Sequence, residues 1–133
     1  YKMKHIQKGM VIGVLQMGAL LFLLSLFINK PALTQALGLQ TDVPVFHLGL
    51  IAFSLLYSPF SMITGIFMNL LSRKNEFEAD NYAKENTGTG AHLITALRKL
   101  SANNLSNLNP NKWYVFFHYS HPPLLERVRN LMK

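Results

Sequence analysis

Two uncharged apolar runs constrain the fold of this chain more than any other feature of its sequence. Residues 10–28 and 45–71 contain no Asp, Glu, Lys or Arg. A helix of about 20 apolar residues spans the hydrocarbon core of a bilayer, and the second run exceeds that length, so we expect tilt or an interfacial end. Pro31 ends the first run, because proline cannot continue a helix without losing a hydrogen bond. The pattern predicts two membrane-spanning helices, the second with a possible kink at Pro59.

The charges around these runs predict their orientation. Three lysines precede the first run and the Arg73-Lys74 pair follows the second, whereas the segment between the runs carries one Lys and one Asp. Cytoplasmic segments of membrane proteins carry an excess of Lys and Arg. We therefore expect residues 1–71 to form a transmembrane helical hairpin with both ends on the cytoplasmic face. His47 is expected at the level of the lipid headgroups.

Composition supports a lipid bilayer as a partner and argues against nucleic acid. Half of the residues are apolar and 14% are charged, against roughly 25% charged residues in soluble proteins. The net charge of +7 comes from basic residues that are scattered along the chain, whereas a nucleic-acid site needs them clustered. The absence of cysteine excludes a disulfide framework and a thiolate zinc site.

The sequence after the second run is polar and predicts further helices. No strand pattern is present, so the predicted fold class is all-α: an integral membrane helical hairpin, followed by a cytoplasmic-side helical segment over residues 72–133. A short helix is also possible near residues 32–39. In the C-terminal segment we expect helices over residues 75–85, 92–105 and 124–132, with an aromatic stretch over residues 112–119.

Two acids four residues apart, Glu76 and Asp80, are the first candidate for chemistry. This spacing puts both carboxylates on one face of a helix, where like charges cost a few tenths of a kcal/mol. A solvated helix face is the simplest interpretation of the spacing alone. A cation such as Arg73, a more distant basic residue or a metal ion would offset the repulsion.

The second candidate is the segment that contains His118 and His121. The spacing alone also suits ordinary packed or exposed histidines. Two prolines directly follow His121 and hold its backbone, and a rigidly placed donor is what stabilisation of a developing oxyanion requires. Arg127 lies six residues further on, where a bidentate pair with the Glu76–Asp80 face would answer the repulsion.

Together these residues resemble a known family. NEFEAD at residues 75–80 and HYSHPPLLERV at residues 118–128, placed after two apolar runs, resemble the C-terminal part of the Ste24-type CAAX prenyl proteases. These belong to the M48 class of membrane zinc metalloproteases, as do the HtpX-type proteases. The resemblance covers essentially the whole chain.

The zinc motif of that family, H-E-x-x-H, does not occur between Tyr1 and Lys133. In the family it stands directly before a helix that continues into a membrane span, and the first residues here resemble that continuation. We therefore expect the chain to be a piece of a longer protein in which the motif precedes Tyr1. His5 is not expected to replace a zinc ligand.

The resemblance implies a role for each candidate residue. It implies a Zn²⁺ ion held by two histidines and a glutamate, with Glu76 as that glutamate. Asp80 would orient a ligand histidine, and Arg127 would be the partner of Asp80 or Glu76. His121 would stabilise the oxyanion, and the general base would be the glutamate of the missing motif. The role of His118 stays open.

The function implied is that of a membrane-embedded zinc endopeptidase that cuts peptide bonds near the C-terminus of prenylated or other membrane-associated substrates. Such a protein would be multi-pass, in a bacterial inner membrane or the endoplasmic reticulum, with its catalytic side cytoplasmic. The piece alone would be inactive. The alternatives are an HtpX-like quality-control protease, a non-enzymatic membrane module that binds a partner, and a stand-alone metal site. That last site would draw its ligands from Glu76, Asp80, His118 and His121.

Overall fold

The structure is a computed structural model that describes residues 4–40 and 42–133. All regular structure in these residues is helical, which confirms the predicted all-α class. The chain divides into two compact units, Tyr1–Met62 and Ile63–Lys133. Helix α3, Phe46–Thr87, contributes to both units, and each unit is described by itself.

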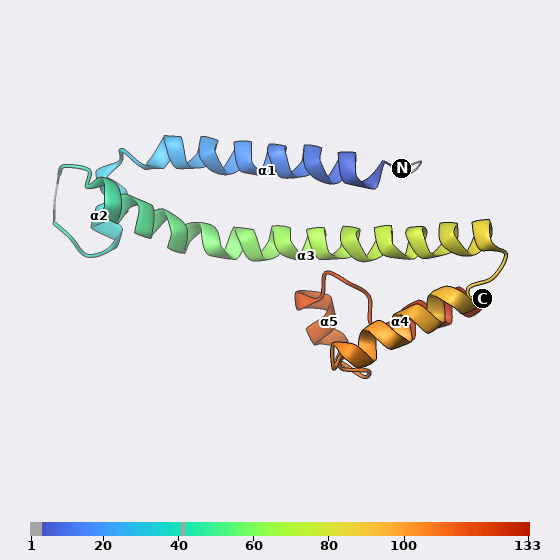
Figure 1. The fold of residues 1–133 in the computed structure, drawn as a ribbon. Helices are drawn as coiled ribbons and strands as arrows, with labels where there is room; N and C mark the ends of the chain where they lie inside the picture. The colour runs from blue at the N-terminus through green and yellow to red at the C-terminus, as the bar shows by residue number, and fades with distance from the viewer. Residues whose placement is uncertain (1–3, 41) are drawn as a thin grey trace. The chain divides into compact units, whose positions relative to one another are not determined.

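The first unit is a helical hairpin. Helix α1, His5–Phe27, and the first part of α3 run side by side in opposite directions and are joined through α2, Pro31–Ala36 (Figure 1). The proline at the first position of α2 suits a helix start, because that N–H has no helical partner. The short helix expected near residues 32–39 is therefore present. A small core holds the unit together and consists of Leu33, Ala52 and Phe53, with Leu23, Leu24 and Tyr57 packed against it.

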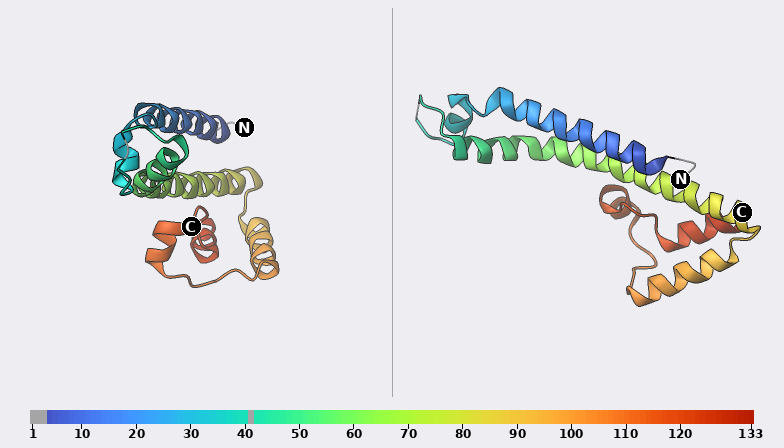
Figure 2. Two further views of the ribbon diagram at one scale, coloured as in Figure 1. Left: turned by 90° about the vertical axis from the view of Figure 1, so that its left-hand side faces the viewer. Right: turned by 45° about the horizontal axis from the view of Figure 1, so that its top comes forward.

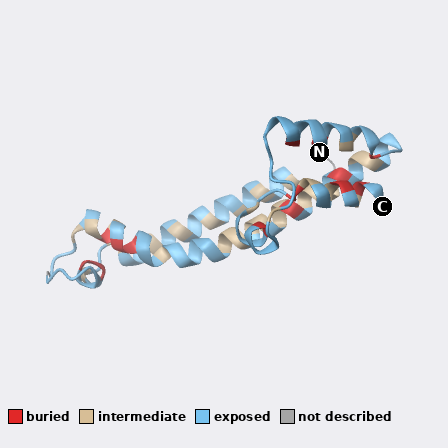
Figure 3. Ribbon diagram, turned by 90° about the horizontal axis from the view of Figure 1, so that it is seen from below, coloured by how far each residue is buried: buried red, intermediate tan, exposed pale blue. Residues whose placement is uncertain are grey.

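Two helices in the described residues are long and apolar enough to cross a membrane. They are α1 and α3, which include the two runs identified in the sequence. No residue of α1 is buried (Figure 3). Large apolar side chains such as Met10, Val14 and Phe22 are exposed along it. A helix that is apolar all round and has no buried residue needs apolar surroundings, and a bilayer supplies them.

Helix α3 continues well past the second apolar run. The helix predicted over residues 75–85 is present, but it forms the last turns of α3 and does not begin anew. The reason is local: from Ser72 onward the chain has no helix breaker until Gly88, which has a φ of +71°. One helix therefore carries the apolar run and the acidic pair without an interruption.

The second unit contains the end of α3 and three shorter helices. Helices α4, Ala91–Asn103, and α6, Leu124–Met132, agree closely with the predicted helices, and the two pack against each other (Figure 2). Helix α5, Lys112–His118, is not predicted from the sequence. Its start has a clear signal, since the Asn111 side chain accepts hydrogen bonds from the backbone N–H groups of Trp113 and Tyr114.

The contact between α4 and α6 depends on a glycine at the start of α4. A Cβ atom on Gly90 would lie 3.1 Å from Leu131 Cβ and 3.1 Å from Leu131 O. We expect Gly90→Ala to destabilise the full-length protein by about 1 kcal/mol or more, since overpacking forces neighbouring groups to move. The measurement is the thermal unfolding midpoint in detergent. Gly65→Ala is the control, because no atom lies within 4 Å of its Cβ position, and an equal loss in both variants would contradict the prediction.

Candidate active site

A row of polar residues on one face of α3 forms the base of the candidate site. Asn69, Arg73, Glu76 and Asp80 follow one another at intervals of three or four residues, which places them on the same side of the helix. Each contacts the segment of residues 115–127: Asn69 and Arg73 meet its first part, and Glu76 and Asp80 meet its second part. The row therefore sets the position of that whole segment along α3.

Asp80 and Arg127 form a bidentate contact at the end of the row. Arg127 Nε donates to Asp80 Oδ2 at 2.8 Å, and Nη2 donates to Oδ1 at 2.6 Å. The Asp80 side chain is only 3% exposed, and that of Arg127 is 20% exposed. A bidentate pair of this kind combines two charge-assisted hydrogen bonds with a fixed orientation. The predicted pairing of Arg127 with the acidic face is therefore present.

Arg127 also neutralises Glu76. Its Nη1 lies 2.9 Å from Glu76 Oε2, close enough for an ion pair, although this oxygen accepts no hydrogen bond and is buried. The hydrogen bond with Asp80, together with the charges of Asp80 and Glu76, raises the pKa of Arg127 above its ordinary value, and burial opposes this effect. One guanidinium thus carries the positive charge that the i, i+4 acidic pair requires.

The second oxygen of Glu76 meets His121. Nδ1 of His121 is in hydrogen-bond contact with Glu76 Oε1. The imidazole is otherwise open, with 75% of its side chain exposed. Pro122 and Pro123, which follow it, are buried, and Pro123 caps the start of α6. The prolines therefore hold the backbone beside His121, while its ring remains accessible next to the acidic pair.

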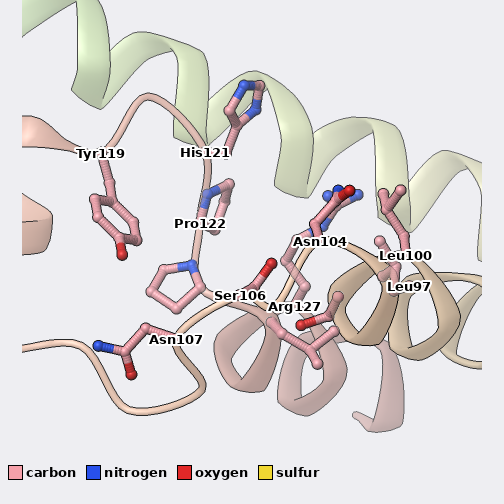
Figure 4. Close-up of a pocket in the computed structure, with 12 residues that line it drawn as sticks. Leu97, Leu100, Asn104, Ser106, Asn107, Tyr119, His121, Pro122 and Arg127 are labelled. Carbon is pink, nitrogen blue, oxygen red and sulfur yellow. The ribbon is translucent and has the colours of Figure 1, made fainter.

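A cavity of about 470 Å³ opens next to these groups. Its walls include Leu97 and Leu100 of α4, and His121 and Arg127 lie at its lining together with Tyr119 (Figure 4). Apolar walls with a few polar groups are typical of sites that bind small ligands or side chains. The cavity gives the site a place for part of a bound molecule.

His118 does not join the other candidates. Its ring packs against Tyr114, with the ring centroids 4.7 Å apart, at the exposed end of α5. No group of three or more His, Asp or Glu side chains in residues 4–40 and 42–133 is arranged to hold a metal ion. Each carboxylate oxygen of Asp80 accepts a hydrogen bond from Arg127. Glu76, Asp80, His118 and His121 are thus not gathered around one point in the described part of the chain.

Glu76 nevertheless has the features of a single metal ligand. Its buried Oε2 meets Arg127 as an ion pair but accepts no hydrogen bond, so a lone pair of this oxygen remains for a cation. Zinc accepts a carboxylate oxygen together with histidine nitrogens. The donor chemistry of this residue fits zinc, provided that two further ligands come from elsewhere in the full-length protein.

Two residues of the polar row, Asn69 and Arg73, were not predicted from the sequence to belong to the site. Arg73 stands in the sequence as a cation that marks the membrane boundary and as one candidate partner for the acidic pair. In the structure it is buried, and it donates to the backbone carbonyls of Val115 and Tyr119. Asn69 donates to Phe117 O at 3.1 Å. The i, i+4 spacing from Asn69 to Arg73, continued to Glu76, was the signal that could have revealed them.

The fold and this site define a class of protein: a helical membrane protein with a carboxylate, an arginine and a histidine gathered where a long apolar helix becomes polar. Comparison with known sequences names the family. The pattern of peptidase family M48 matches residues 1–133. The chain belongs to peptidase family M48.

Individual relatives agree with this assignment. A CAAX prenyl protease 1 homolog of Dictyostelium discoideum is 37% identical over 133 residues, which are the whole chain and 30% of that protein. A CAAX prenyl protease 1 homolog of Homo sapiens is 34% identical over 98% of the chain and 27% of its own length. The crystal structure of S. mikatae Ste24p matches with a TM-score of 0.75 and 26% identity, over 98% of this chain and 34% of that one. The chain thus spans about a third or less of these relatives.

Proposed function

We propose that this chain is part of a membrane-embedded zinc endopeptidase that hydrolyses peptide bonds near the C-terminus of prenylated substrates. One observation carries the proposal: Glu76 lies between Arg127 and His121 and keeps one buried oxygen without a hydrogen bond. A carboxylate held in this way is suited to bind a cation next to an accessible imidazole. The names of the M48 relatives support the substrate class.

Each residue of the site has a part in this proposal. Glu76 would hold the zinc ion together with two ligands from an H-E-x-x-H motif upstream of residue 1, and bound zinc would supply an activated water. Asp80 would orient a ligand histidine, and Arg127 would hold Asp80 and Glu76 in place. His121, with its open ring, would donate a hydrogen bond to the oxyanion that forms when the peptide carbonyl is attacked.

The cavity beside His121 would receive part of the substrate. Its leucine-rich wall on α4 suits an uncharged, apolar residue near the cut bond. The membrane-spanning helices would place this site at the cytoplasmic surface of a multi-pass protein, where a lipid-modified C-terminus is available. The chain by itself would be inactive, because in this proposal two zinc ligands and the general base come from the H-E-x-x-H motif.

Metal removal from the full-length protein tests the proposal. We expect a strong chelator to abolish hydrolysis of a farnesylated peptide in detergent. Stoichiometric zinc should restore the activity, because the protein binds zinc reversibly. The same peptide without the farnesyl group is the substrate control. Full activity in metal-free protein would overturn the zinc assignment. Equal cleavage of both peptides would overturn the prenylated substrate class and favour an HtpX-like quality-control protease.

A further inference from the structure

We infer that Arg73 is a positioning residue that holds His121 in place through the end of α5. The inference rests on the proposed function, in which His121 acts on the substrate. Arg73 touches neither the acidic pair nor His121 through any contact described above. It is nevertheless one of four buried polar or charged residues in the described chain, so its charge needs a structural reason.

The end of α5 supplies that reason. The last carbonyl groups of a helix have no partner within the helix and carry a partial negative charge. Arg73 Nη1 donates to Val115 O at 3.0 Å, which also accepts the Tyr119 N–H, and to Tyr119 O, just beyond the helix. Asn69, one turn earlier on α3, donates to Phe117 O. Two side chains of α3 thus cap the C-terminus of α5.

This cap fixes one end of the short segment that carries His121. Tyr119, whose carbonyl is held by Arg73, lies two residues before His121. The buried Pro122 and Pro123 hold the other end. Between these fixed points only Ser120 and His121 are exposed, so the backbone of His121 has little freedom while both ends are held. Loss of the Arg73 contacts would free the carbonyl two residues before His121, and only Asn69, on Phe117 O, would still hold the end of α5 among the contacts described above.

Arg73 also sets the distance between the two halves of the site. It precedes Glu76 by three residues on the same helix, so the anchor of the His121 segment and the carboxylate that meets His121 move as one body. The orientation of the imidazole relative to Glu76 therefore depends on Arg73. A misplaced catalytic group costs as much as 100-fold in rate for about 1 Å of displacement.

A double-mutant cycle in the full-length protein tests this role. We expect Arg73→Gln to lower kcat by about 10- to 100-fold with KM changed little, because the imidazole is misplaced rather than the substrate site. Arg73→Lys keeps a cation that can reach a carbonyl and should recover part of the rate. In a His121→Ala background, Arg73→Gln should cost no more than about twofold, since residues that act as a unit are not additive. Lys74→Gln, at the next and 72% exposed position, is the matched control and should behave as wild type.

Hydrogen exchange provides a measurement that does not depend on activity. In Arg73→Gln we expect the amides of residues 115–121 to exchange about tenfold faster, because hydrogen bonds from a charged donor are lost. Amides of α4 should be unchanged. Unaltered exchange at residues 115–121, or an equal rate loss with and without His121, would overturn the inference. A wild-type protein with no proteolytic activity would instead overturn the proposed function, and the exchange result would still decide whether Arg73 holds this segment.

Discussion

Replacing Glu76 by Gln in the full-length protein should lower kcat/KM by more than about 100-fold. Mutation of a residue that only hydrogen-bonds to a metal ligand already costs about 10- to 100-fold, and Glu76 would be a ligand itself. The amide keeps the size of the side chain, so the packing against α6 is retained. It removes the charge that a cation requires and that Arg127 neutralises 2.9 Å away. The zinc content of the purified protein should fall together with the activity.

Glu78 provides the matched control for this substitution. It lies two residues away on the same helix, so it faces a different direction, and it forms an ion pair with Lys74 at 3.9 Å. Glu78→Gln should retain zinc and activity within about twofold, as surface substitutions of this kind change little. Thermal unfolding of both variants separates loss of function from loss of fold. A Glu76→Gln protein with full zinc content and wild-type kcat/KM would exclude Glu76 as a ligand.

Sequence reasoning was most successful where a local physical rule decides the structure. The two uncharged runs predict long apolar helices because a bilayer admits little else, and α1 and α3 contain them. Pro122 and Pro123 predict the start of α6 at Leu124, since prolines fit the first turn of a helix or the positions before it. The pairing of Arg127 with Asp80 follows from the need to neutralise two acids on one face.

It was least successful where distant contacts decide. Nothing local shows that Arg73 turns away from the acidic pair toward carbonyl groups more than 40 residues later in the chain. Residues 112–118 are rich in aromatic side chains and show no clear helical pattern, although they form α5. The capping residue Asn111 is the one local signal of this helix. The change from apolar to polar composition after Leu71 suggests a boundary, yet helix propensity continues through it because no Gly or Pro intervenes before Gly88.

The largest effect on stability is expected from breaking the buried pair of Asp80 and Arg127. Arg127→Leu should lower the free energy of unfolding of the full-length protein by about 3–5 kcal/mol, because it leaves the charge of Asp80 buried without a partner. Arg129→Leu is the matched control: it removes the same charge from the same helix at an exposed position, and should change stability by less than about 0.5 kcal/mol. The measurement is equilibrium unfolding in detergent, followed by circular dichroism.

The double variant Asp80→Asn/Arg127→Leu separates the pair from its surroundings. If the cost in Arg127→Leu comes from the abandoned carboxylate, removal of that charge should restore a large part of the lost stability, since a buried ion pair replaced as a whole is often close to neutral. Recovery will be incomplete, because Arg127 also neutralises Glu76. The opposite result is that the losses in the two single variants simply add in the double variant. Additive losses would show that Asp80 and Arg127 act independently. The bidentate contact would then contribute nothing to holding α6 against α3.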